Sequence, residues 1–191
     1  MKHKEFYKSL LHQANLLGFG SSSINDIEGL YLETIIESPL KTEHDLIRTI
    51  HMVYAWMPTM LNLDNFTKVD INAIFLLALR AKNNQISEAD LRRLIIGLSK
   101  ITNNHFVGAS KVLFILNRDV YPIIDSRVIR AWNSQNKNFG LKKIKNISVM
   151  GDENFVANEY LMYKNLLTDC SRLNNVSIRE IEILLFYIGK K

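Results

Sequence analysis

Apolar residues recur at three- and four-residue intervals along most of the chain, a spacing that places them on one face of a helix. The pattern predicts helices at Phe6–Leu17, Ile27–Ile36, Leu46–Trp56, Ile71–Leu79, Leu91–Ile101, Val112–Leu116, Phe155–Leu167 and Ile178–Ile188. A short strand at Ile147–Met150 is an alternative to a loop in that segment. We therefore predict an all-α fold.

Helix starts are marked where a hydroxyl residue precedes an acidic residue by three positions. Such pairs occur at Thr42–Asp45, Thr67–Asp70, Ser87–Asp90 and Ser177–Glu180. The hydroxyl can accept a free backbone N–H of the first turn, and the acid suits the positive end of the helix. Helix ends are predicted at Gly18 and Gly20, Asn83-Asn84 and Asn103-Asn104, because Gly and Asn readily adopt the left-handed conformation that closes a helix.

The length of 191 residues fits a single compact domain, which we expect to consist of two helical lobes around a cleft. The predicted lobes are roughly residues 1–65 with 151–191, and residues 66–150. No Pro- or Ser-rich linker divides the chain. The polar, Gly- and Asn-rich stretch Asn133–Asp152 predicts a surface loop.

The composition is that of a globular protein, with 47% hydrophobic and 23% charged residues. The single cysteine, Cys170, excludes an internal disulfide and fits a reducing compartment. The longest apolar runs, such as Ile74–Leu79, are far shorter than the roughly 20 residues of a membrane span. We expect a cytoplasmic monomer with no membrane partner.

Positive charge is concentrated in one part of the sequence. The net charge is +5, but Lys100–Met150 contains nine basic and two acidic residues, a local charge of +7. The remainder has fifteen basic and seventeen acidic residues. A folded face with this excess is typical of proteins that bind a polyanion, although a merely solvated basic surface would have the same composition.

Several common active sites are absent from the sequence. There is no Gly-rich phosphate loop, no Cys/His spacing that suits zinc and no G-x-S-x-G nucleophile motif. The five histidines show no paired ligand spacing. We therefore expect neither a metal nor another cofactor.

With those active sites excluded, the remaining candidate catalytic residues lie in Val107–Trp132. Lys111 is predicted in the first turn of a helix that begins near Ala109, where the positive helix end disfavours a charged amine. A lysine with a lowered pKa can act as a nucleophile. Asp125 precedes the helix Ser126–Trp132, and a fixed carboxylate there can stabilise a developing oxocarbenium sugar or activate an attacking group.

A structural interpretation stands beside this one. An Asp directly before a helix is most often an N-cap, and a lysine on an apolar helix usually faces solvent. The residues alone leave both interpretations open.

The run GASKVLFILNRDVYPIIDSRV resembles the 8-oxoguanine-DNA-glycosylase-like branch of the helix-hairpin-helix glycosylase superfamily. The shared features are a Ser-Lys that opens a helix, a Leu/Phe-rich helix body, Tyr-Pro-Ile and Asp-Ser-Arg. The stretch Tyr54–Thr59 also looks like a motif of that group. The resemblance implies an all-α fold with a DNA-binding cleft between two lobes. It also implies that Lys111 is the Schiff-base lysine and Asp125 the catalytic aspartate.

The chain departs from the superfamily at the hairpin. The usual Leu-Pro-Gly-Val-Gly is replaced by Asn103-Asn104-His105-Phe106-Val107-Gly108. Phosphate binding is therefore expected to depend mainly on the basic residues that follow. The predicted DNA contacts are Gly108, Ser110, Arg127, Arg130, Lys142, Lys143 and Lys145.

Four aromatic residues are candidates for stacking on a flipped base or for filling the gap it leaves. They are Tyr54, Trp56, Phe106 and Trp132. The alternative for such residues on amphipathic helices is a place in the core.

The function predicted from this resemblance is excision of a modified base from double-stranded DNA. One substrate is a hypermodified phage base such as glucosylated hydroxymethylcytosine, attacked in defence; the alternative is oxidised guanine, removed in repair. Two further alternatives are a non-catalytic DNA-binding helical module and a protein-interaction helical domain.

Overall fold

All regular secondary structure in the described part of the chain is helical, which confirms the predicted all-α class. The computed structural model describes residues 2–19, 39–55, 57, 59–103, 105–145 and 152–190. In chain order its elements are α1 (Lys2–Leu16), α3 (Glu43–Ala55), the 3-10 helix η1 (Leu63–Lys68), α4 (Ile71–Lys82), α5 (Glu88–Ile101), α6 (Phe106–Leu116), α7 (Ser126–Gln135), the 3-10 helix η2 (Asn136–Asn138), α8 (Glu153–Asn174) and α9 (Ile178–Ile188). The helix predicted at Ile27–Ile36, the helix end predicted at Gly20 and the open alternative at Ile147–Met150 lie outside the described residues.

Three of the predicted helix starts form as expected. A first-turn amide of each helix donates to the predicted hydroxyl at 3.0 to 3.3 Å, in α3 to Thr42, in α5 to Ser87 and in α9 to Ser177. The start at Thr67–Asp70 was wrong in its register. Asp70 itself caps α4 by accepting a hydrogen bond from the Ala73 amide at 3.1 Å.

The predicted helix ends coincide with left-handed residues. Gly18, Asn84 and Asn103 have φ values of 83°, 54° and 56°. Asn and Gly tolerate this region better than other residues, so each can terminate a helix and redirect the chain.

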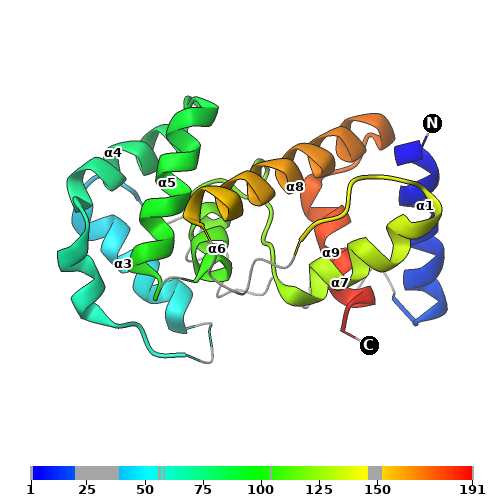
Figure 1. The fold of residues 1–191 in the computed structure, drawn as a ribbon, viewed down its shortest axis with the longest axis horizontal. Coiled ribbons are helices and arrows are strands. Elements are labelled where there is room, and N and C mark those ends of the chain that lie inside the picture. Colours follow the sequence, from blue (N-terminus) through cyan, green and yellow to red (C-terminus); the bar gives the residue numbers. More distant parts are fainter. Residues whose placement is uncertain are drawn as a thin grey trace.

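The helices form two groups along the long axis of the molecule (Figure 1). Helices α3, α4, α5 and α6 pack together at one end, and α1, α7 and α9 pack together at the other. Helix α8 spans the two groups and packs on α5, α1 and α9. The predicted lobe boundaries were therefore wrong, because α3 belongs with α4–α6 and α7 with the terminal helices.

Helix α6 lies in the middle of the core. It contacts α3, α4 and α5, and of its eleven residues only Val107 and Lys111 are not buried. Its sequence is apolar all round, which is typical of a helix that neighbours cover on every side. Lys111 is thus held on a rigid, buried element. No helix among the described residues is long and apolar enough to span a membrane.

Candidate active site and nucleic-acid interface

The Lys111 amine has a lowered pKa, but for a different reason than the sequence indicated. Helix α6 begins at Phe106, so Lys111 lies in its second turn and not in the first. Burial is the main cause of the lowered pKa, and the positive charge of Arg127 lowers it further. The nearby carboxylate of Asp125 opposes this effect by favouring the charged amine.

Asp125 forms the N-cap of α7. Its Oδ1 accepts hydrogen bonds from the backbone amides of Arg127 (2.9 Å) and Val128 (2.8 Å). Both bonds go to Oδ1, and none from a described residue goes to Oδ2. The cap predicted as the structural alternative is therefore real. It also fixes the carboxylate, which is half-buried and within electrostatic range of Lys111.

The extended segment that leads to Asp125 is held from one side by α8. The Tyr160 hydroxyl donates to the carbonyl of Pro122 (3.1 Å), and the Tyr163 hydroxyl donates to the carbonyl of Ile123 (3.2 Å). The two tyrosines are three residues apart and so share one face of α8. Burial raises the pKa of both hydroxyls well above its usual value, so they remain donors.

The same segment is held by α9 through a buried carboxylate. Glu182 accepts a hydrogen bond from the Ile123 amide at 2.9 Å and forms an ion pair with Arg179 one turn earlier. The Arg179 guanidinium lies over the ring of Phe114 on α6, with 4.6 Å between its central carbon and the ring centroid. These contacts connect α9 to both α6 and the Asp125 segment.

Ser110 links the two segments that carry the catalytic candidates. Its hydroxyl donates to the Val107 carbonyl (2.9 Å) and accepts from the Ile124 amide (3.2 Å). Ser110 precedes Lys111, and Ile124 precedes Asp125. One buried hydroxyl therefore sets the separation of the two segments.

The residues that position Asp125 were missed by the sequence interpretation. Glu182 had a usable signal, because it is an acid inside the apolar run Ile181–Leu185, where an unpaired charge is costly. Tyr160 and Tyr163 had none, since buried tyrosines are common on amphipathic helices.

His105 is the N-cap residue of α6, and its side chain makes no capping hydrogen bond. Partial desolvation, and then the positive charge of Lys111, lowers the pKa of its imidazole. His105 therefore lies within electrostatic range of Lys111. Its predicted position in a loop did not indicate this.

Several residues predicted to contact DNA lie in the core instead. The Trp132 side chain is 0% exposed, packs on Phe6 with 4.7 Å between ring centroids, and donates its indole N–H to the Lys142 carbonyl (3.0 Å). Phe106 is also buried. The periodicity that placed these rings on apolar helix faces is the reason they pack inward.

Gly108 and Ser110 are buried as well, and their roles are internal. A Cβ on Gly108 would lie 2.8 Å from the Cβ of Thr102, so the glycine lets the start of α6 pack against the end of α5. A phosphate contact from either residue is not compatible with this burial.

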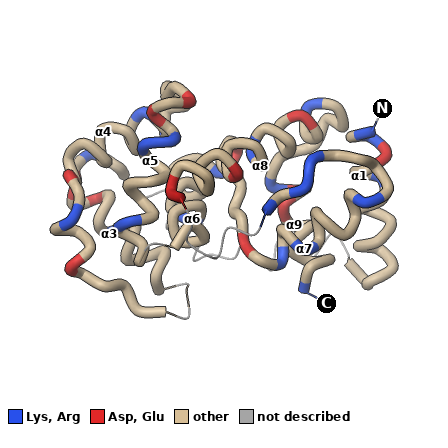
Figure 2. Tube along the Cα trace, in the orientation of Figure 1, with Lys and Arg blue, Asp and Glu red and all other residues tan. Residues whose placement is uncertain are grey.

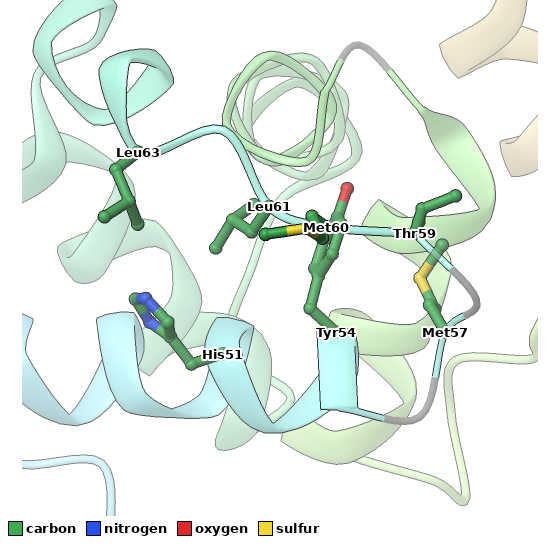
Figure 3. Close-up of a pocket in the computed structure, with 7 residues that line it drawn as sticks. All are labelled: His51, Tyr54, Met57, Thr59, Met60, Leu61 and Leu63. Atoms are coloured by element: carbon green, nitrogen blue, oxygen red, sulfur yellow. The ribbon is translucent and has the colours of Figure 1, made fainter.

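Tyr54 lines an open hollow of about 500 Å³ (Figure 3). The other lining residues are His51, Met57, Thr59, Met60, Leu61 and Leu63. Tyr54 is 6% exposed, and its hydroxyl has no hydrogen-bond partner among the described residues. Burial raises the pKa of this hydroxyl to about 12. Trp56, the fourth aromatic candidate, lies outside the described residues.

The predicted surface loop after α7 is a braced segment that exposes lysines. The Asn133 side chain bonds both the amide (3.0 Å) and the carbonyl (2.7 Å) of Ile144, which is buried. Lys142, Lys143 and Lys145 around it are exposed. Figure 2 shows this basic stretch between α7 and α8.

Arg127 and Arg130 are exposed on α7, close to Asp125 in sequence. Among the described residues, no three His, Cys, Asp or Glu side chains are grouped so that they could hold a metal ion. No family model, curated protein or solved structure matches this chain.

Proposed function

We propose that the protein is a DNA N-glycosylase that flips a modified base out of the duplex and excises it. The observation that carries the proposal is the pairing of Lys111, whose pKa is lowered by burial, with the fixed carboxylate of Asp125. The basic residues on α7 and after it supply the charge for phosphate binding. The resemblance of Gly108–Val128 to the glycosylase superfamily supports the same function.

The covalent route uses Lys111 as the nucleophile. Its neutral amine attacks C1′, the bond from C1′ to the base nitrogen breaks, and the base leaves with the electron pair and takes up a proton. The sugar ring then opens as O4′ takes the amine proton, which leaves a Schiff base. Water hydrolyses this to an abasic site, or loss of a C2′ proton breaks the strand on the 3′ side.

The hydrolytic route needs only Asp125. The carboxylate takes a proton from water, the resulting hydroxide attacks C1′, and the base leaves as before. In the covalent route the negative charge of Asp125 stabilises the developing oxocarbenium ion; in the hydrolytic route it does so until the carboxylate takes the proton from water.

The activity is tested on three duplexes: unmodified DNA, DNA with 8-oxoguanine and glucosylated phage DNA. After incubation, alkali or an abasic-site endonuclease reveals excised bases. We expect breaks in the glucosylated DNA, which would fit defence against phage. Breaks in the 8-oxoguanine DNA alone would favour repair instead.

Two variants and a matched control assign the roles. Lys111→Gln should abolish borohydride trapping of a protein–DNA adduct, and Asp125→Asn should abolish excision by either route. Lys164→Gln is the control, because Lys164 is another half-buried lysine whose pKa is lowered by burial. If the wild-type protein binds DNA but causes no breaks in any of the three duplexes, the function that remains is the non-catalytic binding module. In that case Asp125 is only a helix cap.

A further inference from the structure

The loop between α3 and η1 exposes a large apolar side chain. Met60 is 92% exposed, more than Leu16 (68%), Leu63 (61%), Leu76 (48%) or Leu173 (39%). Leaving so much apolar surface in water is unfavourable, so burial of this side chain against a partner would be favourable.

The part of this loop around Met60 and Asn62 is held by the side chain of Asn103. The Asn103 amide donates from Nδ2 to the Met60 carbonyl (2.7 Å), and its Oδ1 accepts from the Asn62 amide (2.9 Å). Asn65, which is buried, donates to the same Oδ1 at 3.0 Å. Met60 is therefore presented on a clamped backbone.

The clamp also connects the loop to the candidate active site. Asn103 lies in the turn that joins α5 to α6, with the left-handed φ of 56° that ends α5. In that turn the Thr102 hydroxyl donates to the His105 carbonyl at 3.0 Å. Helix α6 follows and carries Lys111. The residue that holds the Met60 backbone and the start of the helix that carries Lys111 thus belong to the same turn.

We propose that Met60 is the wedge that enters the base stack when the protein binds DNA; this rests on the proposed function. Base-flipping proteins insert apolar side chains between base steps, and methionine is one of the residues used. An unbranched, polarisable side chain adapts well to the irregular gap beside an extruded nucleotide. Phe106 and Trp132 are buried and cannot fill that gap.

The test uses a probe that does not depend on the excised base. A short duplex carries a tetrahydrofuran abasic-site analogue with 2-aminopurine opposite, and the protein is the inactive Asp125→Asn variant. Insertion of Met60 unstacks the 2-aminopurine, so its fluorescence should rise severalfold at saturating protein. Adding Met60→Ala should reduce this rise to less than about half, whereas Met60→Leu should retain it.

Leu16→Ala is the matched control, since it removes another exposed apolar side chain, at the end of α1, and should leave the signal unchanged. An equal rise with Met60→Ala, or no rise when the protein binds, would overturn the wedge alone. No binding to any duplex would overturn the proposed function, and the wedge with it.

Discussion

The hydroxyl of Ser110 accepts a hydrogen bond from the amide of Ile124 at 3.2 Å, which joins the helix that carries Lys111 to the segment that ends at Asp125. Ser110→Ala removes this acceptor and leaves a buried N–H unsatisfied, at a cost of about 1–3 kcal/mol. We expect unfolding at lower urea concentration and slower excision by the variant that still folds, because the two catalytic candidates lose their common brace.

Ser99→Ala is the control for this prediction. Ser99 is equally buried, but its hydroxyl donates only to the Ile96 carbonyl within α5. It should leave excision unchanged. Equal excision rates for Ser110→Ala and the wild type would show that the brace does not set the geometry.

The pH dependence of excision should follow the pKa of the Lys111 amine. The amine reacts only when neutral, so the rate rises as the pH passes its pKa. The positive charge of Arg127 lowers this pKa, so Arg127→Met should raise it and move the rising limb to higher pH. The measurement is the single-turnover rate of borohydride-trapped adduct across pH.

Arg130→Met is the matched control, because Arg130 is exposed on the same helix and is not among the charges that shift Lys111. It should leave the midpoint in place. If both variants shift the midpoint equally, the pH dependence reflects the total positive charge of the DNA-binding surface and not the pKa of Lys111.

The buried pair of Arg179 and Glu182 should contribute strongly to stability. Glu182→Ala removes the carboxylate from the guanidinium and the acceptor from the Ile123 amide, and should lower the free energy of unfolding by about 3–5 kcal/mol. The double variant Arg179→Met/Glu182→Leu should recover part of the stability but not excision, since the Ile123 amide still has no acceptor. Urea denaturation measures the first effect.

An exposed pair of the same spacing provides the comparison. Arg172 and Asp169 lie on the surface of α8 at 3.2 Å, and Asp169→Ala should cost less than about 1 kcal/mol. A comparable loss from both variants would contradict a structural role for the buried pair.

The sequence predicted the parts of this molecule that depend on local spacing. The helices, three of their capped starts and the N-cap at Asp125 follow from periodicity and side-chain hydrogen bonding within a few residues. The hydroxyl of Ser110 and the carboxylate of Glu182 could not be assigned, because each acts on a backbone amide far away in sequence. The lobe grouping was missed for the same reason, since periodicity does not say which apolar faces meet.

The hydroxyl of Tyr54, which has no partner in the described part of the chain, leads to opposite expectations for stability and activity. A buried hydroxyl without a partner is unfavourable, so Tyr54→Phe should raise the free energy of unfolding by about 1 kcal/mol. We expect slower base excision, because the side chain lines the hollow beside Met60.

Tyr187→Phe is the control for this prediction. It loses a hydrogen bond to the Leu17 carbonyl (3.0 Å) and should destabilise the protein without slowing excision. A faster or unchanged excision rate for Tyr54→Phe would remove Tyr54 from the substrate site.

The basic segment after α7 should determine how DNA binding depends on salt. Ile144 is buried and held by Asn133, so Lys142 and Lys143 project from a fixed backbone and can each neutralise one phosphate. Each Lys→Ala substitution should reduce the slope of log Kd against log salt by about 1 and weaken binding to all sequences alike. Fluorescence anisotropy over a range of salt concentrations measures both. Arg93→Ala, which removes an exposed charge on α5, should leave the slope unchanged. If the two lysine variants retain the wild-type slope, the phosphate path runs over another face of the molecule, and the Arg127 and Arg130 side chains are the next to be tested.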